Sequence, residues 1–220
     1  MELLGYREGI KKMRILKATL ENIRAAAKVV KRGGLVIYPT ETVYGLGCDP
    51  FNVGAIEKLI RVKGSRDGPL PILAYSLDDV ERVAKLSEAA RKVGERFWPG
   101  PLTLVLLKKL LPDVVTFGLA TVGVRVPDHK DALELVRLSG GLLVGTSANK
   151  SGVEPPCSAV GAFEQLGSEV DVVLDGGVTE FGVSSTVVDL SGGVPRLLRG
   201  GVVSFDPVLE FWDLCVGRGR

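Results

Sequence analysis

Residues 141–152 read GLLVGTSANKSG, a short apolar run followed directly by small and polar residues. Leu142 to Val144 predicts a buried strand, and Gly145 to Asn149 predicts a turn. In α/β proteins, ligands bind just beyond the carboxyl ends of strands. Hydroxyl and amide groups offer partners there, and glycine lets a ligand approach the backbone. An ordinary polar turn has the same pattern, so the rest of the chain has to separate the two interpretations.

Outward from this stretch, strand-like runs alternate with helical patterns. Helices are predicted after the cap residues Thr19, Asn52, Ser76 and Ser87, the third of them running as SLDDVERVAKL to Leu86. Two more are predicted over 130–138 and 159–166. Strands are predicted over 13–18, 35–38, 72–75, 104–107, 121–126 and 170–174, with a hairpin of 185–190 and 195–198. PTETVYGLGCDP, residues 39–50, is predicted as a loop. This order indicates an α/β fold with a mixed sheet.

Length and composition favour one globular unit. The chain has 220 residues, of which 45% are hydrophobic, enough for a single sizeable core. No repeat or linker interrupts it, so we expect an N-terminal extension over residues 1–13 and one domain over 14–220. The net charge of +2 gives no overall electrostatic case for nucleic-acid binding, although a local basic patch stays open. Few aromatic residues also disfavour a base-stacking platform.

Cysteine usage and hydropathy predict the compartment. Cys48, Cys157 and Cys215 are odd in number and widely spaced, which predicts neither a metal site nor a disulfide framework and fits a reducing cytoplasm. Each is expected to be a small buried residue. The N-terminus lacks a signal peptide's apolar core, and no run reaches the roughly 18 apolar residues of a membrane span. We therefore expect a soluble, cytoplasmic protein without membrane contact.

Several kinds of active site are disfavoured. The one histidine, His129, cannot supply a metal site by itself and has no nucleophile-elbow sequence to serve, so a surface or structural role is expected. There is no Walker A motif, and no G-x-G-x-x-G opens a helix after a strand. Neither a P-loop nor a dinucleotide-binding fold is supported.

Hydroxyl groups and cations follow the predicted strands instead. Arg125 is notable because it lies on a strand between Val124 and Val126, where an arginine needs a partner. Each of the other cations alone fits a solvated surface charge, but together the set predicts an anion-binding cleft that acts by positioning and electrostatics. The set comprises Thr40, Thr42, Lys63, Arg66, Arg125, Ser147, Asn149, Ser184, Ser185, Thr186 and Arg199.

Seven segments over residues 20–205 resemble the YrdC/Sua5 family in content and order. They are PTETVYGLG (39–47), PLPIL (69–73), WPGPLT (98–103), TVGVRVPDH (121–129), GTSANKSG (145–152), SSTVVDL (184–190) and LLRGG (197–201). The resemblance implies a twisted mixed α/β sheet flanked by helices around a large concave cleft, in the single-domain form of the family. It also implies an L-threonylcarbamoyladenylate synthase, a nucleotidyltransferase that joins L-threonine, bicarbonate and ATP and releases pyrophosphate. The product feeds t6A modification of tRNA adenosine 37 through downstream transferase machinery.

The resemblance also implies roles for individual residues. Threonine would be bound by Thr40, Arg125 and Ser185. ATP would be bound by Thr121, Ser147, Asn149 and Arg199, and its phosphates also by the catalytic pair Lys63 and Arg66. Mg²⁺ would be held mainly through the ATP phosphates, since the sequence shows no dedicated metal cage.

The sequence departs from the family pattern in the basic loop. The usual K-x-R is here Lys63-Gly64-Ser65-Arg66, and the loop to Pro69 is one residue shorter, so either Arg66 acts from a rearranged loop or the pairing has changed. Pro155 also stands where many relatives carry a polar residue. Two alternatives to the synthase are a double-stranded RNA or tRNA-binding module without catalysis, and the carbamoyl-adenylate role of the related domain in hydrogenase-maturation proteins. Near-neutral charge argues against the first, and the missing acylphosphatase and zinc-finger parts argue against the second.

Overall fold

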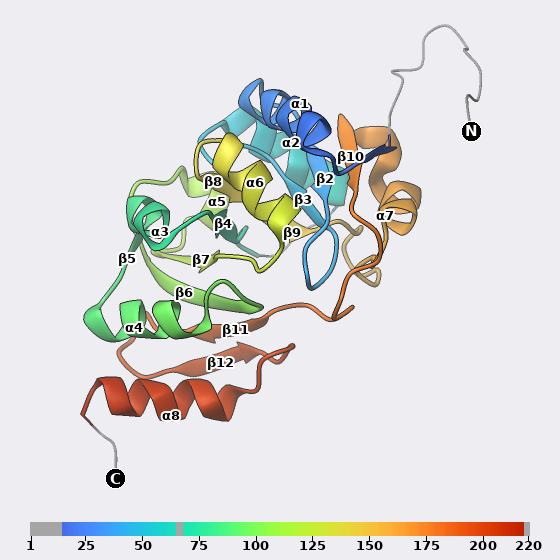
Figure 1. Ribbon diagram of the computed structural model, residues 1–220. Coiled ribbons are helices and arrows are strands. Elements are labelled where there is room, and N and C mark those ends of the chain that lie inside the picture. Colours follow the sequence, from blue (N-terminus) through green and yellow to red (C-terminus); the bar gives the residue numbers. More distant parts are fainter. Residues whose placement is uncertain (1–14, 65–67, 218–220) are drawn as a thin grey trace, which may run out of the picture.

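The computed structural model describes residues 15–64 and 68–217, and its strands form two mixed sheets (Figure 1). The predicted N-terminal extension lies outside the described residues. The smaller sheet has five strands in the order β1-β10-β2-β3-β9. Their bounds, in chain order, are β1 Ile15–Lys17, β2 Val36–Tyr38, β3 Gly45–Gly47, β9 Thr146–Ser147 and β10 Val172–Asp175.

The larger sheet has seven strands, six of them in the order β12-β11-β6-β7-β4-β8, with β5 paired to β6 off this path. It combines parallel pairs such as β4–β7 with antiparallel pairs such as β6–β7. The bounds are β4 Ile72–Ala74, β5 Ala84–Lys85, β6 Leu102–Lys108, β7 Thr121–Arg125, β8 Leu142–Val144, β11 Thr186–Asp189 and β12 Arg196–Arg199. The predicted α/β class with mixed strand directions is confirmed.

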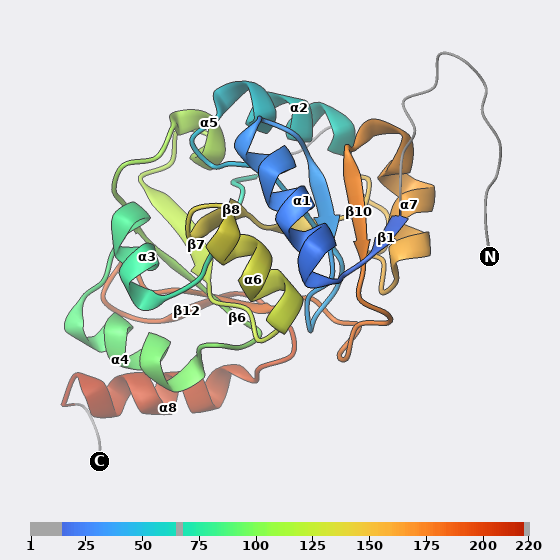
Figure 2. The same ribbon diagram turned by 45° about the horizontal axis from the view of Figure 1, so that its top comes forward.

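Helices cover the outer faces of both sheets. Figures 1 and 2 both show α1 beside α6 at one end of the molecule and α4 beside α8 at the other. None of the helices in the described ranges has both the length and the apolarity needed to cross a bilayer. The bounds are α1 Leu20–Lys31, α2 Val53–Lys63, α3 Leu77–Val83, α4 Glu88–Phe97, α5 Asp113–Thr116, α6 Lys130–Leu138, α7 Ala159–Leu166, the 3₁₀ turn η1 Gly167–Glu169 and α8 Phe205–Cys215.

The predicted helix starts are confirmed by their caps. The side chains of Thr19, Asn52, Ser76 and Ser87 each accept a hydrogen bond from a backbone N–H in the first turn of the helix that follows. This is the contact that makes these residue types favourable before a helix. The predicted hairpin of β11 and β12 is also confirmed as an antiparallel pair.

Other expectations were wrong. The helix after Ser76 ends at Val83, because Ala84 and Lys85 pair with β6 as β5. Residues 39–50 are not all loop: Gly45 to Gly47 form β3, which pairs with both β2 and β9. A Cβ at Gly45 would lie only 2.7 Å from the Tyr38 ring, so the close approach of two strands explains why this strand is glycine-rich. Helix α8 was not predicted.

The opening stretch joins the two sheets. Leu142 to Val144 is a buried strand of the larger sheet, as predicted, but the presumed turn contains β9 of the smaller one. Only Gly145 separates the two strands. Its N–H donates to the carbonyl of Pro71 at 2.8 Å, and a Cβ there would lie 2.5 Å from Leu73 Cγ. The chain therefore crosses from one sheet to the other at a position where only glycine fits.

Candidate functional site

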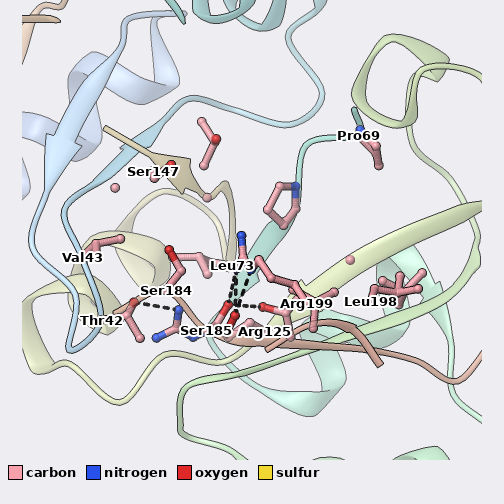
Figure 3. A pocket seen from close by; sticks show the side chains of 18 of the residues that line it. Thr42, Val43, Pro69, Leu73, Arg125, Ser147, Ser184, Ser185, Leu198 and Arg199 are labelled. Carbon is pink, nitrogen blue, oxygen red and sulfur yellow. Dashed lines mark hydrogen bonds between the residues drawn. The ribbon is translucent and has the colours of Figure 1, made fainter. Parts of the chain in front are cut away.

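A cavity of about 570 Å³ opens where the two sheets meet (Figure 3). Its lining comes from the β2–β3 turn, the residues before and in β4, the strands β6, β7, β9, β11 and β12, and Gly145. The volume lies in the range of small-molecule sites in proteins. Eight residues that the sequence analysis singled out contribute to its wall: Thr40, Thr42, Thr121, Arg125, Ser147, Ser184, Ser185 and Arg199.

Thr40 shapes the β2–β3 turn through its own hydroxyl. The Oγ1 atom donates to the carbonyl of Val43 at 2.6 Å and accepts the N–H groups of Thr42 and Val43 at 3.2 and 3.3 Å. These short-range bonds are typical of threonine in a turn. They hold the backbone of residues 40–43 against the cavity, with Thr40 and Thr42 both buried.

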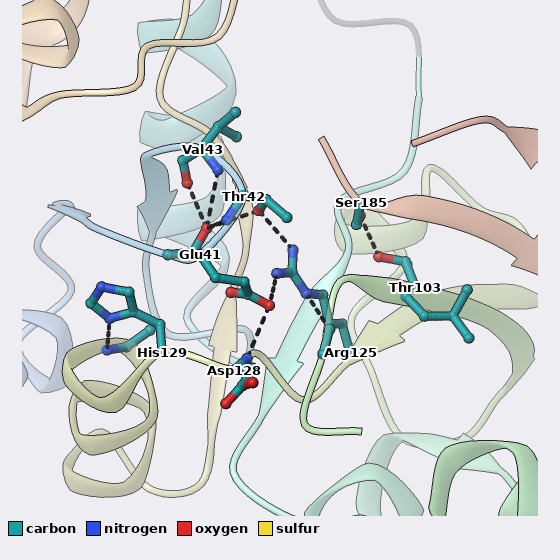
Figure 4. Close-up of polar contacts among 12 residues, drawn as sticks. Glu41, Thr42, Val43, Thr103, Arg125, Asp128, His129 and Ser185 are labelled. Atoms are coloured by element: carbon teal, nitrogen blue, oxygen red, sulfur yellow. Dashed lines mark hydrogen bonds and ion pairs between the residues drawn. The ribbon is translucent and has the colours of Figure 1, made fainter. Parts of the chain in front are cut away.

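Arg125 ends β7 and is almost fully buried, at 6% exposure. Figure 4 shows its guanidinium held on three sides. Its Nε donates to the carbonyl of Gly100 at 3.0 Å and its Nη1 to Thr42 Oγ1 at 3.1 Å, while its Nη2 pairs with the carboxylate of Glu41. An arginine inside an apolar strand was expected to need a partner, and Glu41 is the acidic partner of Arg125.

A second polar group lies in or directly beside other strands of the same sheet as Arg125. Ser185 Oγ lies 2.8 Å from Thr103 Oγ1. Arg199, the last residue of β12, donates from Nη2 to the carbonyl and hydroxyl of Ser185 at 2.8 and 3.2 Å. Burial, and to a lesser extent the nearby charge of Arg125, lower the pKa of the Arg199 guanidinium, but an arginine stays protonated throughout the physiological range. Two cations therefore face one cavity.

Ser147 lies on β9 and is half-buried in the cavity wall. Lys63 and Asn149, which were predicted to bind ATP together with Ser147, lie close to it but are not part of the cavity lining. The Lys63 ammonium donates to the carbonyls of Ser147 and Asn149 at 2.6 and 2.8 Å. Asn149 Nδ2 in turn donates to the carbonyls of Lys150 and Val153. Both side chains thus hold the backbone behind Ser147.

Arg66 lies outside the described residues. Thr121, the first residue of β7, is half-buried at the cavity wall.

Glu41 and Thr103 contribute to the site but were not predicted from the sequence. One indirect indication of Glu41 was present in the sequence: Arg125 lies within an apolar strand and needs an acidic partner, but the pattern does not identify which residue this is. Thr103 had no comparable signal, since its hydroxyl comes from within a strand of apolar residues.

The remaining candidates have structural surroundings. His129 caps α6, with Nδ1 accepting the N–H of Ala132 at 3.5 Å, so its predicted structural role is confirmed. Burial raises the pKa of the Cys48 thiol to about 12, which leaves it an inert core residue. Cys157 and Cys215 are only partly buried, and all three thiols are free.

Within residues 15–64 and 68–217, no three His, Cys, Asp or Glu side chains lie together as a metal site would need. The lining contains one carboxylate, Asp189, and this accepts hydrogen bonds from Ser191 and Arg196. Such a donor set fits Mg²⁺ that arrives on a phosphate ligand and keeps its waters.

The fold and the cavity define a class: an α/β protein with a cavity between two mixed sheets that two arginine side chains line. The family model for Sua5, YciO and YrdC, described as telomere recombination, matches residues 28–201. The chain belongs to this family, so the resemblance drawn from the seven segments is confirmed.

Relatives of known name agree with this placement. The threonylcarbamoyl-AMP synthase of Pyrococcus abyssi is 43% identical over 189 residues, which cover 84% of this chain and 56% of that protein. A putative threonylcarbamoyl-AMP synthase of Mycobacterium tuberculosis is 41% identical over 191 residues, covering 86% and 88%. The chain thus spans little more than half of the first relative and most of the second.

Solved structures share the fold. Pyrococcus abyssi Sua5 complexed with L-threonine matches with a TM-score of 0.86 and 39% identity, covering 95% of this chain and 62% of that one. Escherichia coli YciO matches with a TM-score of 0.82 and 25% identity, covering 91% and 100%.

Proposed function

We propose that this chain is a threonylcarbamoyl-AMP synthase, which forms threonylcarbamoyl-AMP and pyrophosphate from L-threonine, bicarbonate and ATP. The observation that carries the proposal is convergence. Six residues implied by the family resemblance come from five separate segments of the chain, and they line one cavity of about 570 Å³. A cavity of this size has room for a nucleotide and an amino acid.

In this proposal each of the two arginines, Arg125 and Arg199, binds a different substrate. Arg125, with Thr40 and Ser185, binds threonine through its carboxylate and polar groups. Arg199, with Thr121 and Ser147, binds the nucleotide. Guanidinium and hydroxyl groups suit these anions because they donate several directed hydrogen bonds.

The reaction then needs positioning more than a covalent residue. The threonine amine attacks the carbon of bicarbonate, and loss of water leaves a carbamate. A carbamate oxygen attacks the α-phosphorus of ATP, and the bond from that phosphorus to the pyrophosphate oxygen breaks. Holding both substrates in one cleft makes the second step effectively intramolecular, which removes much of its entropic barrier.

Charge on the phosphates has to be offset during this step. Part of that offset would come from Mg²⁺ carried by the nucleotide when it is bound. The catalytic pair expected from the resemblance, Lys63 and Arg66, would supply the rest. Lys63 reaches the cavity in this proposal only by exchanging its contacts with the carbonyls of Ser147 and Asn149. The product would pass to downstream t6A transferase machinery in the cytoplasm, where tRNA is modified.

The test is a turnover assay with purified protein, ATP, Mg²⁺, bicarbonate and labelled threonine. We expect pyrophosphate release that requires both threonine and bicarbonate, together with labelled threonylcarbamoyl-AMP. L-Valine, which has the shape of threonine without its hydroxyl, is the matched control and should turn over far more slowly. Pyrophosphate release that ignores threonine would contradict the proposal. Absent turnover with salt-sensitive binding of double-stranded RNA or tRNA would favour the non-catalytic RNA-binding module.

A further inference from the structure

Glu41 lies beneath the cavity between two threonines that line it. Its side chain is 2% exposed, so its charge is removed from water. The carboxylate pairs with Arg125, which is equally withdrawn. A buried carboxylate is costly unless it is paired and hydrogen-bonded. The pair is therefore a built feature of the cavity floor and not a surface contact.

Glu41 also joins three segments that carry lining residues. Its Oε1 accepts the backbone N–H of Asp128 at 3.0 Å, which ties it to the loop after β7 (Figure 4). Its own carbonyl accepts the N–H of Phe181 at 2.9 Å, in the segment that leads to Ser184 and Ser185. Glu41 thus fixes the β2–β3 turn, the end of β7 and the approach to β11 relative to one another.

The hydrogen bonds of Arg125 show what this arrangement achieves. A guanidinium has five N–H groups in one plane. Nε and Nη1 donate hydrogen bonds to Gly100 and Thr42, and Nη2 forms an ion pair with Glu41. Three contacts fix the plane of a side chain that lines the cavity, and Nη2 is fully buried beside the Glu41 carboxylate.

We propose that Glu41 is a positioning residue: it holds the plane of the Arg125 guanidinium so that the part of this group that lines the cavity binds the threonine carboxylate. The inference rests on the proposed function and adds a residue to it. Without Glu41, the guanidinium loses one of its three anchors and rotates more freely, so its binding of a carboxylate weakens. The proposed function assigns ATP to Arg199, Thr121 and Ser147. ATP binding is much less affected, because none of these three residues is hydrogen-bonded to Glu41.

The experiment compares Glu41→Ala, Glu41→Asp and Glu41→Gln with the wild-type chain. Asp keeps the charge but withdraws it by one methylene group, whereas Gln keeps the length and the acceptor oxygen. We expect Glu41→Ala and Glu41→Asp to raise the KM for threonine by about tenfold or more, the loss typical of a misoriented charge-assisted hydrogen bond. Glu41→Gln should change it less, and the KM for ATP should stay within about twofold in all three.

Two further measurements separate orientation from general damage. In an Arg125→Ala background, Glu41→Asp should add nothing to the KM for threonine, because the residues act through one another. Glu134→Gln, which breaks the exposed pair with Arg137 at 2.7 Å, is the matched control and should leave both KM values unchanged. Melting curves identify any variant that does not fold, and in that event the Asp and Gln variants decide.

The outcomes are distinct from those of the proposed function. If the wild-type chain shows no threonine-dependent turnover, the synthase proposal itself fails. If the wild type turns over and the variants shift both KM values equally, or neither, Glu41 serves only stability and the positioning role is wrong. Additive effects of Glu41→Asp and Arg125→Ala would overturn it in the same way.

Discussion

At the scale of single residues, removal of the Ser147 hydroxyl is the simplest test of whether the cavity binds the nucleotide. The Ser147 carbonyl holds Lys63, but the Ser147 side chain lies at the cavity wall and supports no other described element. Removing Oγ would therefore remove the nucleotide contact proposed for Ser147 and little else.

We expect Ser147→Ala to lower kcat/KM for ATP by about 10- to 100-fold, the effect of losing one hydrogen bond to a charged phosphate. The melting temperature should stay within about 2 °C, since no buried partner is left unsatisfied. Steady-state kinetics and a thermal scan measure the two effects. Ser151→Ala, at an exposed position outside the lining, is the control. Unchanged kinetics in Ser147→Ala would remove this residue from the site.

Replacement of Lys63, unlike that of Ser147, is expected to lower stability, because the Lys63 ammonium is buried and donates to two backbone carbonyls. Lys63→Met should lower the free energy of unfolding by about 2–3 kcal/mol, since each buried acceptor left without a donor costs about 1–3 kcal/mol. Urea unfolding measures this loss.

Lys31→Met is the matched control for Lys63→Met. Lys31 is also the last residue of its helix but is exposed, so its replacement should change stability by less than about 0.5 kcal/mol. Equal effects of the two substitutions would mean that the buried ammonium contributes nothing to holding residues 147–149.

At the scale of one element, α6 has a cap that depends on pH. His129 Nδ1 can accept the Ala132 N–H only while it is unprotonated. Burial lowers the pKa of His129 below its ordinary 6.5, with Asp131 opposing the shift. The folded state thus binds this proton less readily than the unfolded state. Its contribution to stability is complete above pH 6.5 and is lost as pH falls through 6.5 toward the lower folded pKa.

His129→Asn should remove this dependence, because asparagine caps a helix without titrating there. Between pH 7.5 and 5.5 the wild type should lose about 0.5–1 kcal/mol more than the variant. Urea midpoints at the two pH values measure the difference, and His129 is the one histidine of the chain, so no other imidazole confuses it. Parallel pH dependence in both proteins would rule out the titrating cap.

At the scale of the whole molecule, local signals predicted the elements but not their division into sheets. Caps such as Thr19 and Asn52 act within one turn of their own helix, so the sequence reveals them directly. β3 and β9 depend on partners far away in the chain: Gly45 pairs with Ser147 across about a hundred residues, and neither segment has strand-like composition. Two sheets rather than one therefore could not be read from local pattern.

The cavity shows the same limit. Arg125 was identified because an arginine inside an apolar strand requires a partner. Thr40, Ser147 and Ser185 were named as hydroxyls at strand ends, but only folding shows that they face one space. Lys63 and Asn149 were grouped with the nucleotide ligands, and the fold places them behind the wall. Sequence pattern gives the chemistry of a side chain, whereas the direction in which it points depends on tertiary packing.

The single-residue crossing at Gly145 has a mechanical consequence. A connection of one residue has no slack, and its N–H is bonded to Pro71 while β9 is paired with β3. At this end the short connection restricts movement of the two sheets relative to each other, so the width of the cavity between them is fixed. The cavity groups on the two sheets, other than Lys63, are therefore held at a fixed spacing before a ligand binds. Little reorganisation is then needed when charge moves within the cavity.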